Sequence, residues 1–131
     1  MRVVLDTNVI ISSIFWKERN CHKIVEMAIS KRIINHTNQQ IIQELGKILI
    51  EKFEQPQEKA AEQIALLSGY SELVISDEKV NISRDTKDNM IIDCAVACNA
   101  NYIVTGDNDL LCLNEFKGIK IVRPKQFLDI L

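Results

Sequence analysis

The sequence predicts an α/β protein in which helices cover both faces of a parallel sheet. Short apolar runs rich in β-branched residues alternate with stretches that carry apolar residues at helical spacing. The chain has 131 residues, a typical length for one domain, and contains no repeats, low-complexity segments or linkers rich in glycine and serine. We therefore expect a single domain over residues 1–131.

Five short runs, apolar except for Lys120 in the last, predict the strands, because buried strands of parallel sheets are largely apolar on both faces. The runs are 3–5, 33–34, 73–75, 102–104 and 119–122. The runs 3–5 and 102–104 are uniformly apolar, so we expect them near the centre of the sheet.

Capping residues and prolines mark the predicted helices. Thr37 and Gln40 match a capping box, and Pro56 and Pro124 are suited to the first turn of a helix. Gly69 is expected to end the helix that Pro56 opens. The predicted helices cover residues 9–15, 21–29, 37–49, 56–67, 86–99 and 124–131.

Composition narrows the function classes. The formal net charge of −2 argues against a protein that binds nucleic acid by bulk attraction, although metal ions could offset an acidic site. No apolar stretch approaches the roughly 20 residues of a membrane helix, and the start of the chain does not resemble a signal peptide. We expect a cytoplasmic protein with no membrane partner.

The four cysteines and two histidines do not suggest a site of their own. The cysteines lack the spacing of a zinc site and are expected to be reduced thiols that act as small buried residues. His22 and His36 have no triad-like context, and we expect both on the surface.

Carboxylates follow two of the central strands. Asp6 comes directly after the run 3–5, and Asp107 follows the run 102–104 after two residues. Ligand sites of parallel sheets lie beyond the carboxyl ends of the strands, so these side chains are expected to share one crevice. Glu44 and Asp88, on two of the predicted helices, are placed to join them.

Such a cluster predicts a metal site, because close carboxylates repel one another and Mg²⁺ and Mn²⁺ prefer oxygen ligands. Each acid also has an ordinary structural explanation. Asp6 and Asp88 suit helix N-termini, Asp107 suits a turn, and Glu44 suits a solvated helix face.

Three segments of the chain together resemble PIN domains. They are residues 4–9 (VLDTNV), 84–89 (RDTKDN) and 100–111 (ANYIVTGDNDLL). The similarity extends in order and spacing over essentially the whole chain. It is greatest to the bacterial and archaeal branch of VapC-like ribonucleases, described as toxins of toxin–antitoxin pairs.

The resemblance implies a three-layer α/β/α fold and an endoribonuclease that uses Mg²⁺ or Mn²⁺ to hydrolyse RNA phosphodiesters. The expected products carry a 5′-phosphate and a 3′-hydroxyl. The expected partners are an RNA substrate, a cognate antitoxin and a second copy of the chain in a homodimer.

The resemblance also assigns roles to individual residues. The four family acids, which hold the metal and are catalytic, match Asp6, Glu44, Asp88 and Asp107. The supporting positions match Asn8, Asp85, Thr105 and Asp109. The chain departs from many members of the branch at Thr86, where they have proline. Thr86 can cap the helix in place of the proline, so we expect the fold to be retained.

Basic residues are the expected contacts for RNA. The candidates are Lys17, Arg19 and Arg84, together with the group Lys117, Lys120, Arg123 and Lys125 near the final strand. They could equally be ordinary solvated surface charges.

Two other functions remain open from the sequence. A phosphatase-like metal hydrolase on a related α/β fold is one, although Asn8 stands where a haloacid dehalogenase has its second aspartate. A catalytically silent PIN module that binds RNA or protein is the other. A nucleotide-binding role is disfavoured, because the four glycines are isolated.

Overall fold

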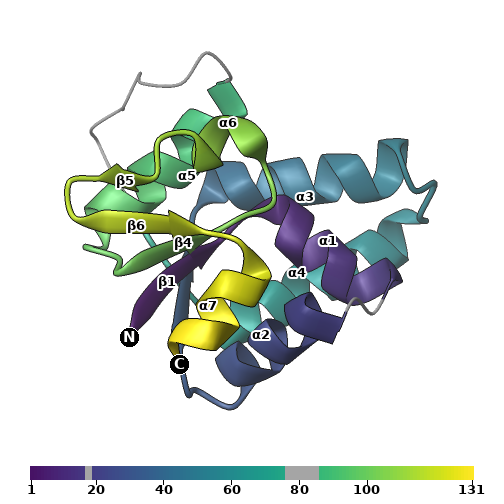
Figure 1. Ribbon diagram of the computed structural model, residues 1–131. Coiled ribbons are helices and arrows are strands. Elements are labelled where there is room, and N and C mark those ends of the chain that lie inside the picture. Colours follow the sequence, from purple (N-terminus) through teal and green to yellow (C-terminus); the bar gives the residue numbers. More distant parts are fainter. Residues whose placement is uncertain (17–18, 76–85) are drawn as a thin grey trace.

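The computed structural model describes residues 1–16, 19–75 and 86–131 of the chain. A central, mostly parallel sheet has helices on both faces (Figure 1). This arrangement confirms the predicted three-layer α/β/α fold. Lys17, Arg84 and Asp85, three of the residues singled out in the sequence, lie outside the described residues.

The sheet has six strands in the order β3-β2-β1-β4-β6-β5. Five of them are parallel, and β5 alone runs antiparallel, against β6. The strands are β1 (Arg2–Leu5), β2 (Ile34–Thr37), β3 (Ser71–Leu73), β4 (Tyr102–Val104), β5 (Glu115–Phe116) and β6 (Ile119–Val122). As expected, β1 and β4 are adjacent at the centre of the sheet.

The helices divide between the two faces. Buried side chains of α1, α2, α4 and α7 pack together on one face, and those of α5 and α6 pack on the other; α3 contributes to both. The helices are α1 (Thr7–Phe15), α2 (Arg19–Ile29), α3 (Gln39–Glu51), α4 (Gln57–Tyr70), α5 (Thr86–Ala97), α6 (Asn108–Leu111) and α7 (Pro124–Ile130).

Alternation along the central strands builds these two cores. Val3 and Leu5 point to the face of α1 and α2, whereas Val4 points to the face of α5. Val104 and Ile103 divide in the same way on β4. Because successive side chains of a strand face opposite sides, one apolar run supplies both layers.

Several predicted helix boundaries differ from the observed ones by two or three residues, and two of them rest on a residue that was expected to cap or end a helix. Asn38, not Thr37, is the N-cap of α3, and its Oδ1 accepts a hydrogen bond from the backbone N of Ile41 at 2.8 Å. Thr37 is instead the last residue of β2 and pairs with Leu73. Gly69 does not end α4, which continues to Tyr70 before the chain enters β3.

The apolar residues of α5 and α2 differ in burial. Ile91 and Ala95 of α5 are buried, whereas Cys98, just after that helix, is only partly buried. On α2, Ile24 and Ala28 are buried but Ile29 is 57% exposed. The four cysteines are free thiols. No helix in the described part of the chain has the length and apolar character needed to cross a membrane.

Candidate metal centre

Three neighbouring strands end at the same level of the sheet. Leu5 of β1 is in register with Val104 of β4, which is in register with Val122 of β6. Backbone pairing continues one residue further, since Asp6 N donates to Val104 O and Thr105 N donates to Val122 O, each at 3.0 Å. Asp6, Thr105 and Arg123, the residues that follow the three strands, are therefore brought to one edge.

Asp6 is buried at this edge and both its carboxylate oxygens are held. Oδ1 accepts from Thr7 N at 2.7 Å and caps α1. Oδ2 accepts from Thr105 Oγ1 at 2.6 Å and from Asn8 Nδ2 at 3.3 Å. Asp6 thus serves as a helix cap and also has a fixed orientation, so the two explanations offered by the sequence are compatible.

Thr105 connects Asp6 to the next acid. Its Oγ1 donates to Asp6 and accepts from Asp107 N at 2.9 Å. Asp107 Oδ1 then accepts from Asp109 N at 2.9 Å and caps α6. Asn8 adds a parallel link, because its Oδ1 accepts from Gly106 N at 3.3 Å. These bonds fix the loop after β4 against the start of α1.

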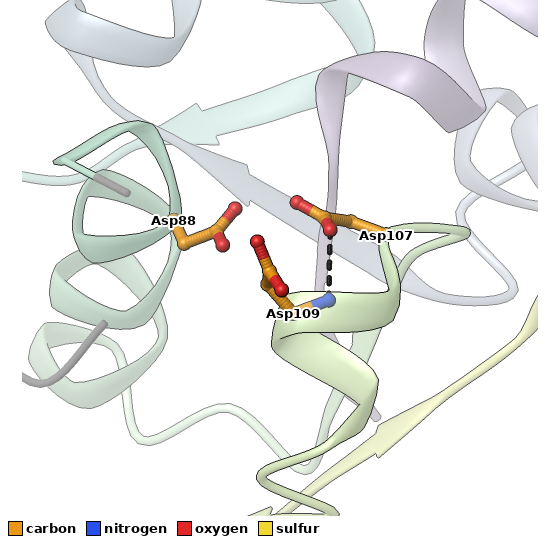
Figure 2. Close-up of side chains that lie close together, drawn as sticks. All are labelled: Asp88, Asp107 and Asp109. Carbon is orange, nitrogen blue, oxygen red and sulfur yellow. Dashed lines mark hydrogen bonds between the residues drawn. The ribbon is translucent and has the colours of Figure 1, made fainter. Parts of the chain in front are cut away.

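The carboxylates of three aspartates converge at the end of this loop. One oxygen each of Asp88, Asp107 and Asp109 lies within 4.8 Å of the other two, and Figure 2 shows the three side chains pointing toward a common point. Asp88 comes from the first turn of α5 and is only 3% exposed, whereas Asp107 and Asp109 come from the start of α6. Three hard oxygen donors at this spacing fit the ligand preference of Mg²⁺ or Mn²⁺.

Asn38 holds the helix that carries Asp88. While its Oδ1 caps α3, its Nδ2 donates to the backbone O of Met90 in α5 at 3.2 Å. One side chain therefore joins the start of α3 to the first turns of α5. This role of Asn38 was not predicted from the sequence. Its position directly after a strand, in a capping context, was the available signal.

The structure brings some of the predicted acids closer together than others. Asp88 and Asp107 are members of the three-carboxylate group, and Asp109, expected only in support, is the third. Asp6 is outside the group but is linked to it through Thr105. Glu44 is half-buried on α3 and is also outside the group. Of the predicted substrate contacts, Arg19 is exposed at the start of α2.

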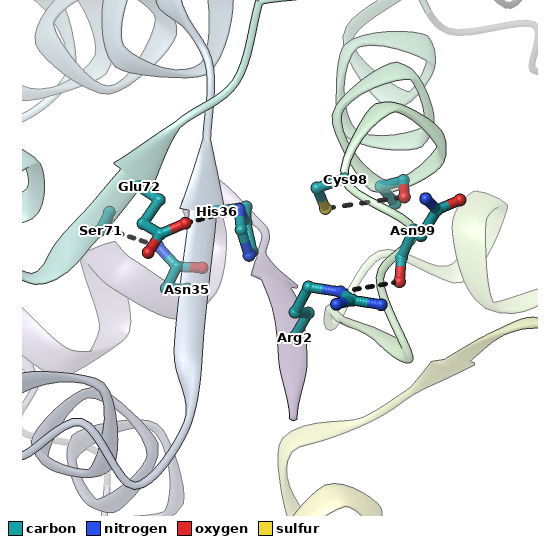
Figure 3. Close-up of polar contacts among 8 residues, drawn as sticks. Arg2, Asn35, His36, Ser71, Glu72, Cys98 and Asn99 are labelled. Atoms are coloured by element: carbon teal, nitrogen blue, oxygen red, sulfur yellow. Dashed lines mark hydrogen bonds and ion pairs between the residues drawn. The ribbon is translucent and has the colours of Figure 1, made fainter.

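A second polar cluster lies on the sheet and corrects the expectation that His36 is a surface residue (Figure 3). His36 is only 6% exposed, because β2 is an inner strand. Its Nδ1 lies 3.9 Å from Glu72 Oε2, and its Nε2 has no hydrogen-bond partner. Burial lowers the pKa of His36 and Arg2 adds to the effect, while Glu72 opposes it.

Residues 2–109 match the sequence model of the PIN domain, and the chain belongs to the PIN domain family. Among curated proteins it is similar to MJ1680, an uncharacterized protein of Methanocaldococcus jannaschii. The two are 30% identical over 141 aligned residues, which cover 98% of this chain and 90% of the relative.

Two solved structures share the fold. One is VapBC2 from Rickettsia felis bound to a DNA fragment from their promoter, with a TM-score of 0.66, 16% identity and coverage of 94% of this chain and 98% of that one. The other is VapBC-1 from nontypeable Haemophilus influenzae, with a TM-score of 0.65, 19% identity and coverage of 95% and 99%.

Proposed function

We propose that this protein is an endoribonuclease that requires Mg²⁺ or Mn²⁺. The observation that carries the proposal is the group of three carboxylates, Asp88, Asp107 and Asp109, at the carboxyl edge of a parallel sheet. Membership of the PIN domain family supports it further, since the sequence resemblance implies RNA cleavage.

The protein's own contribution is to hold acidic side chains in place before substrate arrives. Thr105 and Asn8 orient Asp6, and the Asp107–Asp109 hydrogen bond orients the loop that carries both residues. A bound divalent cation would lower the pKa of a water molecule and offset charge on the scissile phosphate. The proposed metal ligands and catalytic acids are four residues: Asp6, Glu44, Asp88 and Asp107.

The proposal includes a partner. Both similar solved structures are of VapBC proteins, and this supports a role as the toxin of a cytoplasmic toxin–antitoxin pair with a cognate antitoxin. We also propose that the chain forms a homodimer, which light scattering of the purified protein would test.

The test is cleavage of a panel of structured and single-stranded RNAs with Mg²⁺, with Mn²⁺ and with EDTA. The proposal requires metal-dependent cleavage by wild type that is lost in Asp6→Asn and in Asp88→Asn. Asp129→Asn is the matched control, because Asp129 is exposed near the end of α7 and is not a member of the three-carboxylate group. This variant should cut RNA at the wild-type rate.

Other outcomes would identify a different function. Release of phosphate from a small phosphomonoester, with RNA left intact, would indicate a phosphatase. Stabilisation of wild type by metal, with neither substrate cut, would indicate a silent binding module. Cleavage that survives in Asp88→Asn would show that the proposed site is wrong.

A further inference from the structure

Arg123 stands at the same edge of the sheet as the acids. It follows Val122, which pairs with Val104, so it emerges beside Thr105. Its guanidinium Nη2 donates to Asn108 Oδ1 at 3.1 Å. Asn108 is the first residue of α6, and the contact therefore places a positive charge at the start of the helix that Asp107 caps and that carries Asp109.

The position of Arg123 is an unfavourable one for helix stability. Arg123 is the N-cap of α7, where Ser, Thr, Asp or Asn is preferred because the side chain must accept a hydrogen bond. A guanidinium has no acceptor. The backbone N of Arg123 is satisfied by Gln126 Oε1 at 2.9 Å, but the side chain turns away to Asn108. Departures from local preference of this kind are expected at functional positions.

The guanidinium retains donors for a ligand. Arg123 is exposed, and among the described residues no carboxylate forms an ion pair with it. Its contact with Asn108 uses one of five N–H donors. The remaining donors form a planar fork whose geometry matches a phosphate group, and the contact with Asn108 limits the conformations of the side chain.

We propose that Arg123 binds a phosphate of the RNA backbone next to the one that is cut. The inference rests on the proposed nuclease function and adds a substrate-binding residue to it. A polyanion that approaches three carboxylates needs a nearby positive charge in addition to any bound metal. Arg123 supplies that charge at the start of α6, at the same edge of the sheet as the acids.

The experiment compares cleavage kinetics of one labelled single-stranded RNA, cut by wild type, over a range of salt concentration. Arg123→Gln should raise KM roughly tenfold, with kcat changed by less than about twofold. The slope of log affinity against log salt should fall by about 0.7, which corresponds to one lost phosphate contact on a single strand. Arg123→Lys should restore part of both effects.

Three further variants separate phosphate binding from other effects. Arg32→Gln removes an equal charge at an exposed position just before β2, at the end of the sheet where the parallel strands begin. It should leave KM and the salt slope unchanged. Asn108→Ala removes only the tether and should keep most of the salt slope. Arg123→Ser introduces a preferred cap, so it should melt at a higher temperature than wild type and still bind RNA more weakly.

The outcomes distinguish this inference from the proposed function. If wild type neither binds nor cuts RNA, the proposed function is wrong and the inference fails with it. If wild type cuts RNA and Arg123→Gln has an unchanged salt slope, the inference alone is overturned. If Asn108→Ala and Arg123→Gln raise KM equally and neither changes the salt slope, Arg123 only supports the loop. That result would also overturn the inference.

Discussion

Replacing Thr105 with valine should destabilise the protein through the loss of one hydroxyl. Thr105 is completely buried, and its Oγ1 both donates to Asp6 Oδ2 at 2.6 Å and accepts from Asp107 N at 2.9 Å. A short hydrogen bond to an ionised carboxylate contributes about 1.5–3 kcal/mol, and a stranded backbone N–H costs about 1 kcal/mol. We therefore expect Thr105→Val to lower the free energy of unfolding by about 3 kcal/mol.

Thr105→Ser is the control, because serine keeps the hydroxyl and loses only a methyl group. That loss should cost about 1 kcal/mol. Urea denaturation of the metal-free protein at neutral pH would measure both variants, and the expected difference of about 2 kcal/mol is well above the uncertainty of comparing midpoints. If valine costs no more than serine, the hydroxyl does not stabilise Asp6 and the described role of Thr105 is wrong.

Three further predictions test other contacts. Asn38→Ser keeps a capping oxygen and loses the amide bond to Met90 O, so it should cost about 1 kcal/mol in urea denaturation, whereas Asn38→Ala should cost about 2 kcal/mol. Because the pKa of His36 is lowered from 6.5, its contribution to stability is present above that value and is lost as pH falls through the folded-state pKa. His36→Gln should therefore lose less unfolding free energy than wild type between about pH 7 and pH 5. Equal losses in the two proteins would contradict the lowered pKa of His36. Mn²⁺ at about 100 times its Kd should raise the melting temperature of wild type by about 10 °C, reversibly with EDTA, and should have much less effect on Asp88→Asn.

The sequence was sufficient to predict most of the fold because the elements bury large apolar runs. The strands 102–104 and 119–122 were predicted with the bounds that the structure gives them. The strand β5 and the helix α6 were not predicted, since elements of two and four residues are too short to show a period. The helix start at residue 37 was misplaced because Thr37 and Asn38 are both good capping residues. Pairing of Thr37 with Leu73 decides between them, and that contact is not local in the sequence.

The site was predictable where it depends on strand ends and less so where it depends on side-chain direction. Asp6 and Asp107 follow uniformly apolar runs, so their placement at one edge could be inferred. The inclusion of Asp109 in the acidic group depends on the single turn that Asp107 caps. Arg123 was among the basic residues named from the sequence, but its contact with Asn108 and that of Asn38 with Met90 span 15 and 52 residues, which no local pattern contains.

The hydrogen bond between Thr105 and Asp6 spans 99 positions of the chain, and it has a consequence for biosynthesis. A ribosome-bound chain that ends before residue 102 contains Asp6, Glu44 and Asp88 but lacks β4 and the acids that follow it. Assembly of the centre requires the pairing of β1 with β4, a contact between distant segments that forms late in synthesis. If the proposed activity is correct, the growing chain has no complete site with which to cut the RNA that surrounds it during translation.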